Sequence, residues 1–235
     1  MAYQLCTPKL PSFKRWFTLL KNYPKCSCLR AMEYEAMDDL ILSGNGLDFG
    51  GGKNARYLKH LHGKFNLDSV NIDQKINPTF LTKPGEAFPS KDSQYDFVIS
   101  LNTLEHIYNA NFVLKEIQRV LKPKGIAYIF VPFMLRIHAH PDDFFRATPS
   151  WWIESYKAAG FKSAKITPLV WGKRITALSM GARSIFLPKF LYRHICALFD
   201  TLHAYINCKF LKQNKAKHIK RITAVSEGWF MEIEK

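Results

Sequence analysis

The feature that most constrains the fold of this chain is a cluster of glycines that follows an apolar stretch. Residues 47–54 read Leu-Asp-Phe-Gly-Gly-Gly-Lys-Asn, and residues 55–58 can begin a helix. Glycines at a strand-to-helix turn reach backbone angles that other residues resist, and they let a ligand lie against the main chain. The segment therefore predicts a cofactor loop. By itself it also fits a dinucleotide fingerprint, Gly50-x-Gly52-x-x-Ala55, or a purely structural turn.

The composition indicates a folded protein with a strong positive charge. The chain has 235 residues, of which 47% are hydrophobic, enough for one sizeable core. Its 34 basic and 19 acidic residues give a net charge of +15. This charge indicates attraction to an anionic partner, such as nucleic acid, a phospholipid surface or a phosphorylated substrate. A solvated basic face is the alternative.

The cysteines predict neither a disulfide framework nor a metal site. There are 5 of them, an odd number, and the amino terminus has no compact apolar signal region, so we expect a cytoplasmic location. Cys26-x-Cys28 is too closely spaced for a zinc knuckle, and no later Cys or His motif pairs with it. We therefore expect no bound metal. No window of about 18 apolar residues predicts a transmembrane helix.

Residues 1–45 are predicted to form a helical cap that precedes the core. Aromatic residues recur at helical spacing within residues 13–20, among basic residues, and we expect this helix to pack on the domain rather than lie on a membrane. A second amphipathic helix is predicted at residues 29–42. Residues 43–46, Ser-Gly-Asn-Gly, are predicted to form a turn.

From residue 46 to residue 170 the pattern alternates between strands and helices. Such regular alternation predicts an α/β core in which helices cover both faces of a parallel sheet. The predicted strands are residues 47–49, 69–72, 80–82, 95–101, 126–131 and 161–170, with a last one at 224–233. The predicted helices are residues 54–61, 112–121 and 148–159, the last with Thr148 as its N-cap and Gly160 as its stop.

A long interruption, residues 171–221, is predicted to be a helical, basic insertion before the last strand, which lies in residues 222–235. One helix within it has a wide apolar side and a narrow polar one. The apolar side consists of Leu191, Ile195, Leu198, Leu202 and Ile206, and the polar side of Arg193, Asp200 and Asn207. Basic residues follow from Lys209 to Arg221. Two interpretations stay open: a membrane-surface helix whose lysines face anionic headgroups, or a lid or dimer helix.

An acidic residue stands where a nucleotide-bearing cofactor needs one. Asp73 ends the second predicted strand about 20 residues after Gly52, where a carboxylate accepts hydrogen bonds from ribose hydroxyls. A lone aspartate at this position can equally cap a turn. Asp48 lies just before the glycines, where dehydrogenase fingerprints usually have an apolar residue, so it argues against a nicotinamide cofactor.

Short motifs follow one another in order along the core. They are residues 47–52 (Leu-Asp-Phe-Gly-Gly-Gly), 71–73 (Asn-Ile-Asp), 85–89 (Gly-Glu-Ala-Phe-Pro), 95–100 (Tyr-Asp-Phe-Val-Ile-Ser), 104–107 (Leu-Glu-His-Ile) and 116–125 (Glu-Ile-Gln-Arg-Val-Leu-Lys-Pro-Lys-Gly). In this order they resemble the motifs of class I S-adenosylmethionine-dependent methyltransferases. The resemblance is closest to the small-molecule branch that includes the quinone-biosynthesis C-methyltransferases. It covers residues 46–170 well and residues 222–235 loosely.

The resemblance implies a Rossmann-like, doubly wound sheet of seven strands, mostly parallel with a reversed last strand, and S-adenosylmethionine as the cofactor. In the family, an acid in the position of Asp48 helps to hold the methionine ammonium group. The main chain of Gly50, Gly51 and Gly52 would pass under the methionine portion, and Asp73 would bind both ribose hydroxyls.

Four further positions follow from the same resemblance. Ser100 and Asn102 would lie beneath the sulfonium, where the fourth strand ends. Glu86 substitutes for the acid that usually contacts adenine. Asn54 replaces the third glycine of the family loop, and its tolerance of left-handed angles would preserve the turn. Glu105 and the histidine after it are expected to start the following helix rather than to take part in the chemistry.

The loop after the fifth strand, residues 136–148, is predicted to line the acceptor site. Its His-Pro-Asp-Asp-Phe-Phe-Arg-Ala-Thr run resembles one that is common in bacterial methyltransferases associated with surface glycans and lipids. His138 and His140 are the candidate general bases, and Arg146 is the candidate for binding an anionic group of the acceptor. The alternative is that the aspartates of this loop cap a turn and pair with Arg146.

These features together predict a cytoplasmic methyltransferase that uses S-adenosylmethionine on a small molecule, a saccharide or a lipid-linked intermediate handled at the inner membrane surface. A nucleic-acid methyltransferase, favoured by the net charge, and a non-catalytic membrane-peripheral protein on the same fold are the alternatives. Against nucleic acid, residues 100–103 lack the Asn/Asp-Pro-Pro-aromatic motif of amino-methylating DNA enzymes, and the basic residues cluster away from stacking aromatics. The sequence does not predict an oligomeric state.

Overall fold

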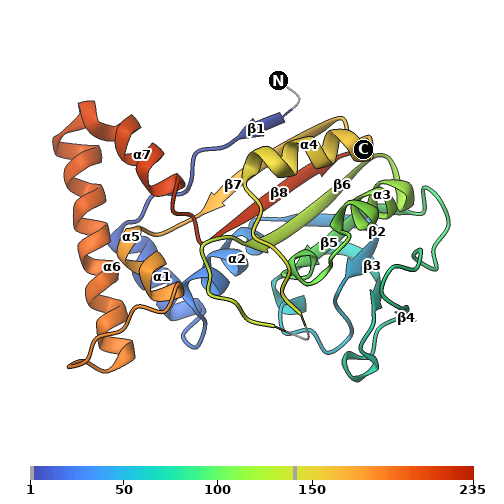
Figure 1. Ribbon diagram of the computed structural model, residues 1–235, viewed down its shortest axis with the longest axis horizontal. Coiled ribbons are helices and arrows are strands. Elements are labelled where there is room, and N and C mark those ends of the chain that lie inside the picture. The colour runs from blue at the N-terminus through green and yellow to red at the C-terminus, as the bar shows by residue number, and fades with distance from the viewer. Residues whose placement is uncertain (1–2, 140–141) are drawn as a thin grey trace.

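A central, mostly parallel sheet organises the protein (Figure 1). The computed structural model describes residues 3–139 and 142–235. Within these residues the sheet has 8 strands in the order β1-β7-β8-β6-β5-β2-β3-β4. The strands are β1 (Tyr3–Leu5), β2 (Ile41–Phe49), β3 (His62–Asn71), β4 (Phe80–Leu81), β5 (Tyr95–Leu101), β6 (Leu121–Pro132), β7 (Ser163–Leu169) and β8 (Gly228–Glu234).

The predicted α/β fold and the reversed last strand are confirmed. β8 runs antiparallel to both of its neighbours, β6 and β7, and the other strand pairs are parallel. The additional strand is β1, which pairs with β7 at the edge of the sheet and was not predicted. It is too short to carry an alternating pattern that a sequence reading could detect.

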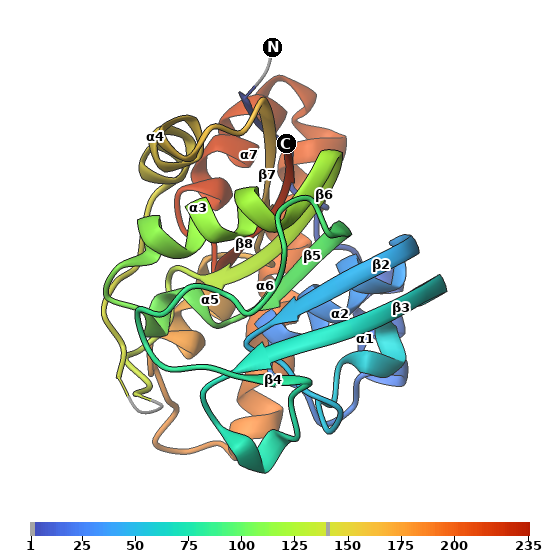
Figure 2. The ribbon, with the colours of Figure 1, turned by 90° about the vertical axis from the view of Figure 1, so that its right-hand side faces the viewer.

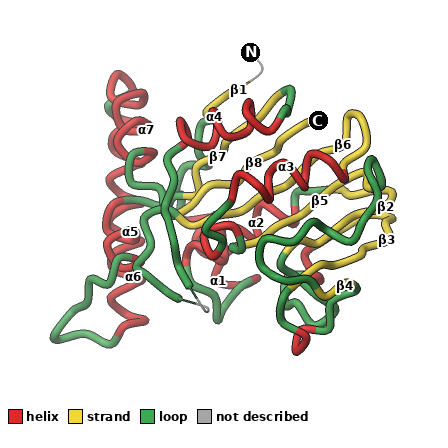
Figure 3. Tube along the Cα trace, turned by 45° about the vertical axis from the view of Figure 1, so that its right-hand side comes forward, coloured by secondary structure: helices red, strands yellow, loops and turns green. Residues whose placement is uncertain are grey.

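Helices cover both faces of the sheet (Figures 2 and 3). On one face, α3 and α4 pack against a core that includes Ile117 and Trp152. On the other, α1, α2, α5 and α6 enclose a second core. The helices are α1 (Phe13–Asn22), α2 (Cys28–Asp38), α3 (Ala110–Val120), α4 (Pro149–Ala159), α5 (Lys173–Ser179), α6 (Lys189–Tyr205) and α7 (Lys215–Thr223). The predicted start and stop of α4, at Thr148 and Gly160, are both confirmed.

Two local predictions beside the glycine loop were wrong. Residues 43–46 continue β2 instead of forming a turn, because they pair in register with β3 on one side and Asn45 N–H donates to Asp96 at 2.8 Å on the other. Residues 54–61 form turns and a short 3₁₀ segment, Leu58–His60, instead of a helix. The N–H groups of Lys53 and Asn54 bond to the loop after β3, at 3.2 and 3.4 Å, and so attach this segment to the neighbouring strand end.

The insertion packs on the rest of the protein through the side of α6 that carries small and polar residues. The buried residues of α6 are Cys196, Ala197, Asp200, Thr201 and Ala204. The Asp200 carboxylate accepts bonds from the backbone N–H groups of Arg174 and Ile175, at 2.9 and 3.0 Å, and so binds the amino end of α5. Among the described residues, no helix is both long and apolar enough to cross a membrane.

Trp171 connects the insertion and the first helix to the sheet. Its side chain is fully buried, and its ring centroid lies 5.0 Å from that of Trp16 on α1. Its indole N–H lies 3.3 Å from the Thr201 hydroxyl of α6. Helix α1 thus packs on the domain, as the sequence analysis favoured, although Phe17 on its outer side is 66% exposed.

We predict that Trp171→Ala lowers the free energy of unfolding by about 3–5 kcal/mol, because it opens a large cavity between α1, α6 and the sheet. Phe17→Ala, at an exposed position of the adjoining helix, is the matched control and should change it by less than about 0.5 kcal/mol. Urea denaturation followed by circular dichroism measures both. Equal losses in the two variants would contradict this role for Trp171.

Candidate functional site

The predicted cofactor residues other than Glu86 lie at or near the carboxyl ends of three neighbouring strands, β5, β2 and β3. After β2 the chain builds the sheet outward through β3 and β4, and it then returns to add β5 on the opposite side of β2. Such a reversal leaves a crevice outside the carboxyl ends of the two strands, where ligands bind in open α/β sheets. Gly50 follows β2, Asp73 follows β3, and Asn102 follows β5.

The glycine loop is held in place by contacts that only glycines permit. Gly50 has a φ of +88°, and a Cβ atom there would overlap the Thr103 side chain. A Cβ atom at Gly52 would overlap the carbonyl oxygen of Ile76. The Asn71 side-chain amide, at the end of β3, donates to the Gly50 carbonyl at 2.5 Å. The glycines therefore fit a main chain that lies close to its neighbours on both sides.

Asp48 lies buried beneath this loop. Its two carboxylate oxygens are 2.6 and 2.7 Å from the Tyr57 hydroxyl, which donates to them. Burial raises the pKa of Asp48 to about 7, and the Tyr57 hydrogen bond partly opposes this shift. A Cβ atom at Gly51 would overlap the Asp48 carboxylate. Tyr57 was not predicted, because the sequence pattern placed it in a helix that does not form.

Asp73 caps a turn and keeps part of its carboxylate exposed. Its Oδ1 atom accepts from the N–H of Lys75 at 2.9 Å, and its own N–H donates to Asn71 at 2.9 Å. Capping and ribose binding are therefore compatible roles for this residue. Glu86 is exposed on the loop beyond β4, where it accepts from the N–H of Lys83 at 3.2 Å.

The loop does not use the left-handed tolerance of Asn54. Among the described non-glycine residues, those with positive φ are Asn77, Ser93, Asn102 and Lys124. Asn54 therefore occupies no left-handed conformation, and the tolerance of asparagine for such angles is not needed in this loop. Two asparagines use this tolerance instead: Asn77, with a φ of +53°, after β3, and Asn102, with a φ of +49°, at the end of β5.

Two polar atoms at the end of β5 are buried without a partner among the described residues. They are the hydroxyl oxygen of Ser100 and the side-chain carbonyl oxygen of Asn102. Buried polar atoms normally have hydrogen-bond partners, which the protein, ordered water or a bound group can supply. The glycine loop, the Asp73 carboxylate and these two atoms fit a nucleotide-bearing cofactor.

The acceptor loop brings His138 to Glu105 and His106. Phe144 N–H donates to the Glu105 carbonyl at 2.9 Å, which attaches the loop to the short 3₁₀ segment Leu104–His106. The Nε2 atoms of His106 and His138 lie 3.6 and 3.9 Å from the Glu105 carboxylate. Sequence reasoning predicted only His138 here. His140, the other candidate base, lies outside the described residues.

Arg146 pairs with Asp143, as the structural alternative for this loop predicted. Both terminal guanidinium nitrogens donate to the Asp143 carboxylate, one of them at 2.6 Å. The same carboxylate accepts from the backbone N–H of His138 at 2.9 Å. The guanidinium holds the pKa of Asp143 at about 2 despite partial burial. This ion pair fixes the loop that carries His138.

A cavity of about 480 Å³ lies beside this loop and includes Arg146 in its wall. Aromatic side chains form much of the rest, namely Tyr108, Phe144, Phe145 and Trp151. Another cavity, lined by Ile41, Asp96 and Lys122, lies at the opposite edge of the sheet and is remote from the glycine loop. The aromatic cavity is therefore the candidate acceptor site.

Asp48 should make stability depend on pH. The folded protein holds this proton more tightly than the unfolded chain does, because the pKa is about 7 when folded and about 4 when unfolded. The free energy of unfolding should therefore fall as pH rises through this window, by about 1.4 kcal/mol for each pKa unit of difference. Asp48→Asn should remove the contribution of Asp48 to this fall, which lies between about pH 4 and about pH 7. Glu154→Gln, at an exposed position, should keep the same fall as the wild type. Identical dependence of the free energy of unfolding on pH in all three proteins, measured by urea denaturation, would contradict the raised pKa of Asp48.

The comparisons with known proteins agree with this geometry. Residues 47–129 match the family model described as a methyltransferase domain. An uncharacterized protein from Methanocaldococcus jannaschii is 28% identical over 153 residues, which span 59% of this chain and 74% of that protein.

Solved structures show the same fold. A SAM-dependent methyltransferase from Archaeoglobus fulgidus superposes with a TM-score of 0.55 at 14% identity, covering 94% of this chain and 99% of that one. The complex between the Haloferax volcanii Trm112 methyltransferase activator and its methyltransferase partner also gives 0.55 at 14% identity, covering 95% of both chains. Residues 47–129 therefore match a methyltransferase domain, and the chain as a whole has the fold of S-adenosylmethionine-dependent methyltransferases.

Proposed function

We propose that this enzyme methylates a small-molecule acceptor carried by a lipid, a lipid-linked saccharide, at the surface of an anionic membrane. The observation that carries the proposal is the outward-facing apolar side of α6 and of the loop before it. This segment adjoins the acceptor loop, because Arg136 N–H donates to the carbonyl of Ser179, at the end of α5, at 3.2 Å. A lipid bound there would bring its headgroup to the candidate acceptor site.

The α6 face is an extensive exposed apolar surface. Its most exposed side chains are Ile185 (93%), Phe186 (91%), Phe210 (72%) and Phe190 (64%). The predicted apolar side of the helix belongs to it, since Leu198, Leu202 and Ile206 are 44%, 39% and 47% exposed. We define the α6 face as Ile185, Phe186, Phe190, Leu191, Leu198, Phe199, Leu202, Tyr205, Ile206, Phe210 and Leu211. Apolar patches of this kind mark interaction surfaces.

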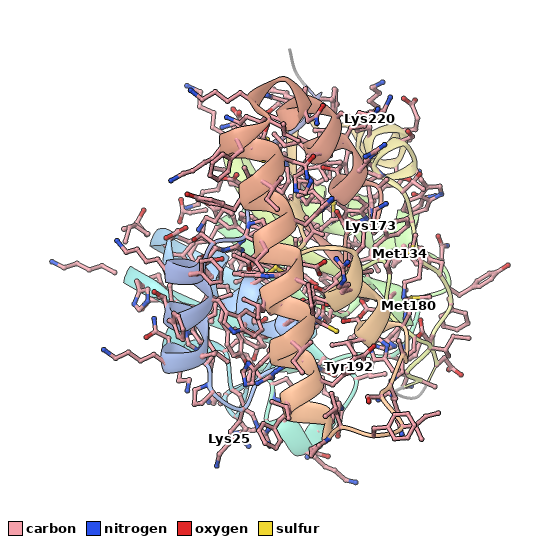
Figure 4. All side chains as sticks on the ribbon, turned by 90° about the vertical axis from the view of Figure 1, so that its left-hand side faces the viewer. Lys25, Met134, Lys173, Met180, Tyr192 and Lys220 are labelled. Carbon is pink, nitrogen blue, oxygen red and sulfur yellow. The ribbon has the colours of Figure 1, made fainter. Side chains whose placement is uncertain are left out.

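Basic residues surround the α6 face. Figure 4 looks onto α6, with Lys220 toward one end of the helix and Lys25 toward the other. The segment from Lys209 to Arg221 adds exposed positive charge directly after the helix. An apolar helix side bordered by lysines complements an anionic bilayer, because the side chains enter the headgroup region while the lysines contact phosphates. Nucleic acid has no comparable use for aliphatic residues such as Ile185 and Leu202.

The crevice residues have roles that follow from their geometry. The cofactor, when bound, supplies a methyl group on a sulfonium. The glycine-loop main chain would lie against its methionine portion, and Asp73 would accept hydrogen bonds from the ribose hydroxyls. An ammonium group near Asp48 would favour the ionised carboxylate, whose pKa is about 7 before binding. Ser100 and Asn102 would supply polar contacts at the end of β5, and Glu86 would contact the adenine end.

Methyl transfer to a hydroxyl depends on positioning, on exclusion of water and on removal of one proton. Burial lowers the pKa of His138, so this imidazole is neutral at pH 7 and can accept that proton. The aromatic side chains of the cavity, Tyr108, Phe144 and Trp151, offer flat surfaces for a saccharide ring. Arg146 would contact an anionic group of the acceptor from its position in the same wall, while Asp143 keeps it in place.

Asp73 provides the test of cofactor binding. We expect Asp73→Ala to weaken S-adenosylhomocysteine binding by roughly 10- to 100-fold, because hydrogen bonds to a charged group contribute about 1.5–3 kcal/mol each. Glu154→Ala, which removes a carboxylate that is 72% exposed and distant from the crevice, should bind like the wild type. Titration calorimetry measures all three proteins. A folded wild-type protein that does not bind S-adenosylhomocysteine would overturn the proposed function.

Vesicle co-sedimentation tests the α6 face. We expect binding to vesicles that contain phosphatidylglycerol, little binding to phosphatidylcholine alone, and weakening by salt, because the lysines contribute through screened charges. Replacing both Ile185 and Phe186 by Ser should reduce binding about 10-fold. Ile41 is 77% exposed but lies at the amino end of β2, away from the α6 face, so Ile41→Ser should leave vesicle binding unchanged. If sedimentation velocity instead shows a dimer that the double variant dissociates, the α6 face is a subunit interface and the membrane proposal fails.

A further inference from the structure

Three potential metal ligands converge beside the crevice. One ligand atom each from Glu105, His106 and His138 lies within 4.8 Å of the other two. The Glu105 Oε1 atom is 3.6 Å from His106 Nε2 and 3.9 Å from His138 Nε2. Ligands bound to one cation at about 2.1 Å lie roughly 3–3.5 Å apart. Movements of a few tenths of an ångström would therefore bring Glu105 to coordination distance together with either imidazole.

The Glu105 carboxylate lacks any other partner. Its side chain is 2% exposed, and neither oxygen has a hydrogen-bond partner among the described residues. A buried carboxylate in this position is stable as an anion only where a positive charge compensates it. The ion pair of Arg146 is made with Asp143 instead.

The surroundings orient both imidazoles for coordination. His106 Nδ1 bonds to the carbonyl oxygen of Asp142, which can only accept, so the proton is on Nδ1 and the Nε2 lone pair faces Glu105. His138 Nδ1 lies 3.4 Å from the Arg136 carbonyl and 3.5 Å from the Asp143 carboxylate, which favour the same tautomer, whereas the Arg146 guanidinium can only donate to this nitrogen and favours the other one. Arg146 also approaches this nitrogen, at 3.2 Å, in a contact that must open when Nε2 binds a cation.

We propose that Glu105, His106 and His138 form a binding site for a divalent transition-metal cation. Two imidazoles and a carboxylate are the ligand set of catalytic zinc sites and of non-haem iron sites, and they leave positions open for further ligands. His138 is 39% exposed, so the site opens toward solvent on the side of the acceptor loop. We expected no bound metal because the sequence lacks a cysteine motif. A site made of one carboxylate and two imidazoles needs no cysteine, so that argument does not apply to it.

A cation here would have a chemical use in the proposed reaction. A bound divalent cation lowers the pKa of a hydroxyl that it contacts. It would therefore ease loss of the acceptor proton to the solvent that reaches the open side of the site. With the cation bound, His138 would be a ligand, and it would act as the base only in the metal-free enzyme. This catalytic role of the cation rests on the proposed function. Metal binding itself does not.

Binding of Co²⁺ and Zn²⁺ to the chelator-treated full chain tests the site. We expect one tightly bound Co²⁺ with visible absorption bands, displaced by an equivalent of Zn²⁺. Glu105→Gln and His138→Ala should each weaken binding by at least about 100-fold, since loss of a ligand costs more than loss of its supporting contacts. His138 is partly exposed on a loop, so its variant keeps the test valid if Glu105→Gln fails to fold.

His62→Ala is the matched control. His62 lies 3.1 Å from Asp38, beside His60, in a different cluster of imidazoles and carboxylate, and its variant should bind Co²⁺ as the wild type does. Loss of the cation in His62→Ala alone, or absence of binding at micromolar Co²⁺, would overturn the proposal. Calorimetry with S-adenosylhomocysteine on the same samples separates the two proposals: cofactor binding without metal binding refutes only this site, and metal binding without cofactor binding refutes only the proposed function.

Discussion

The contact on which the rest of the site depends is the hydrogen bond from the Asn71 side chain to the Gly50 carbonyl. It joins the loop after β2 to the end of β3. Because Gly50 has no side chain, Thr103 also packs closely against this loop, and the loop thereby contacts the end of β5. Three strand ends are thereby held in one arrangement. The cofactor crevice follows from this arrangement, because parallel strands bring their carboxyl ends to one edge of the sheet.

A second constraint acts on the opposite flank of the crevice, where the insertion is attached through polar groups. Asp200 binds the amino end of α5, and Trp171 contacts Thr201 and the first helix. Since these contacts use the small and polar side of α6, its large apolar side chains remain outside. The packing of α6 through its small and polar residues therefore both completes the core on this side and leaves the apolar surface exposed. A helix that buried its larger side chains would have left no such surface.

The sequence predicted the parts of the site that are local. The strand at residues 95–101 and the boundaries of α4 were correct, because each has a strong local signal in apolar content or capping. Predictions failed where long-range bonds override local preference, as in residues 43–46 and 54–61. Tyr57 and the amide of Asn71 were missed as site residues for the same reason. Asn71 reaches Gly50 through the register of β2 and β3, and Tyr57 reaches Asp48 through the turns at residues 53–57, and no local pattern encodes either contact.

The sequence by itself determined the class of fold, through the alternation of strands and helices, and it indicated the cofactor through the resemblance of its ordered motifs to those of class I methyltransferases. Only the tertiary structure decided which way α6 faces, because an amphipathic helix records two sides but not which one meets the protein. It also decided that Glu105, His106 and His138 converge. Ligands on separate loops become neighbours only when the strands that carry the loops are paired in the sheet.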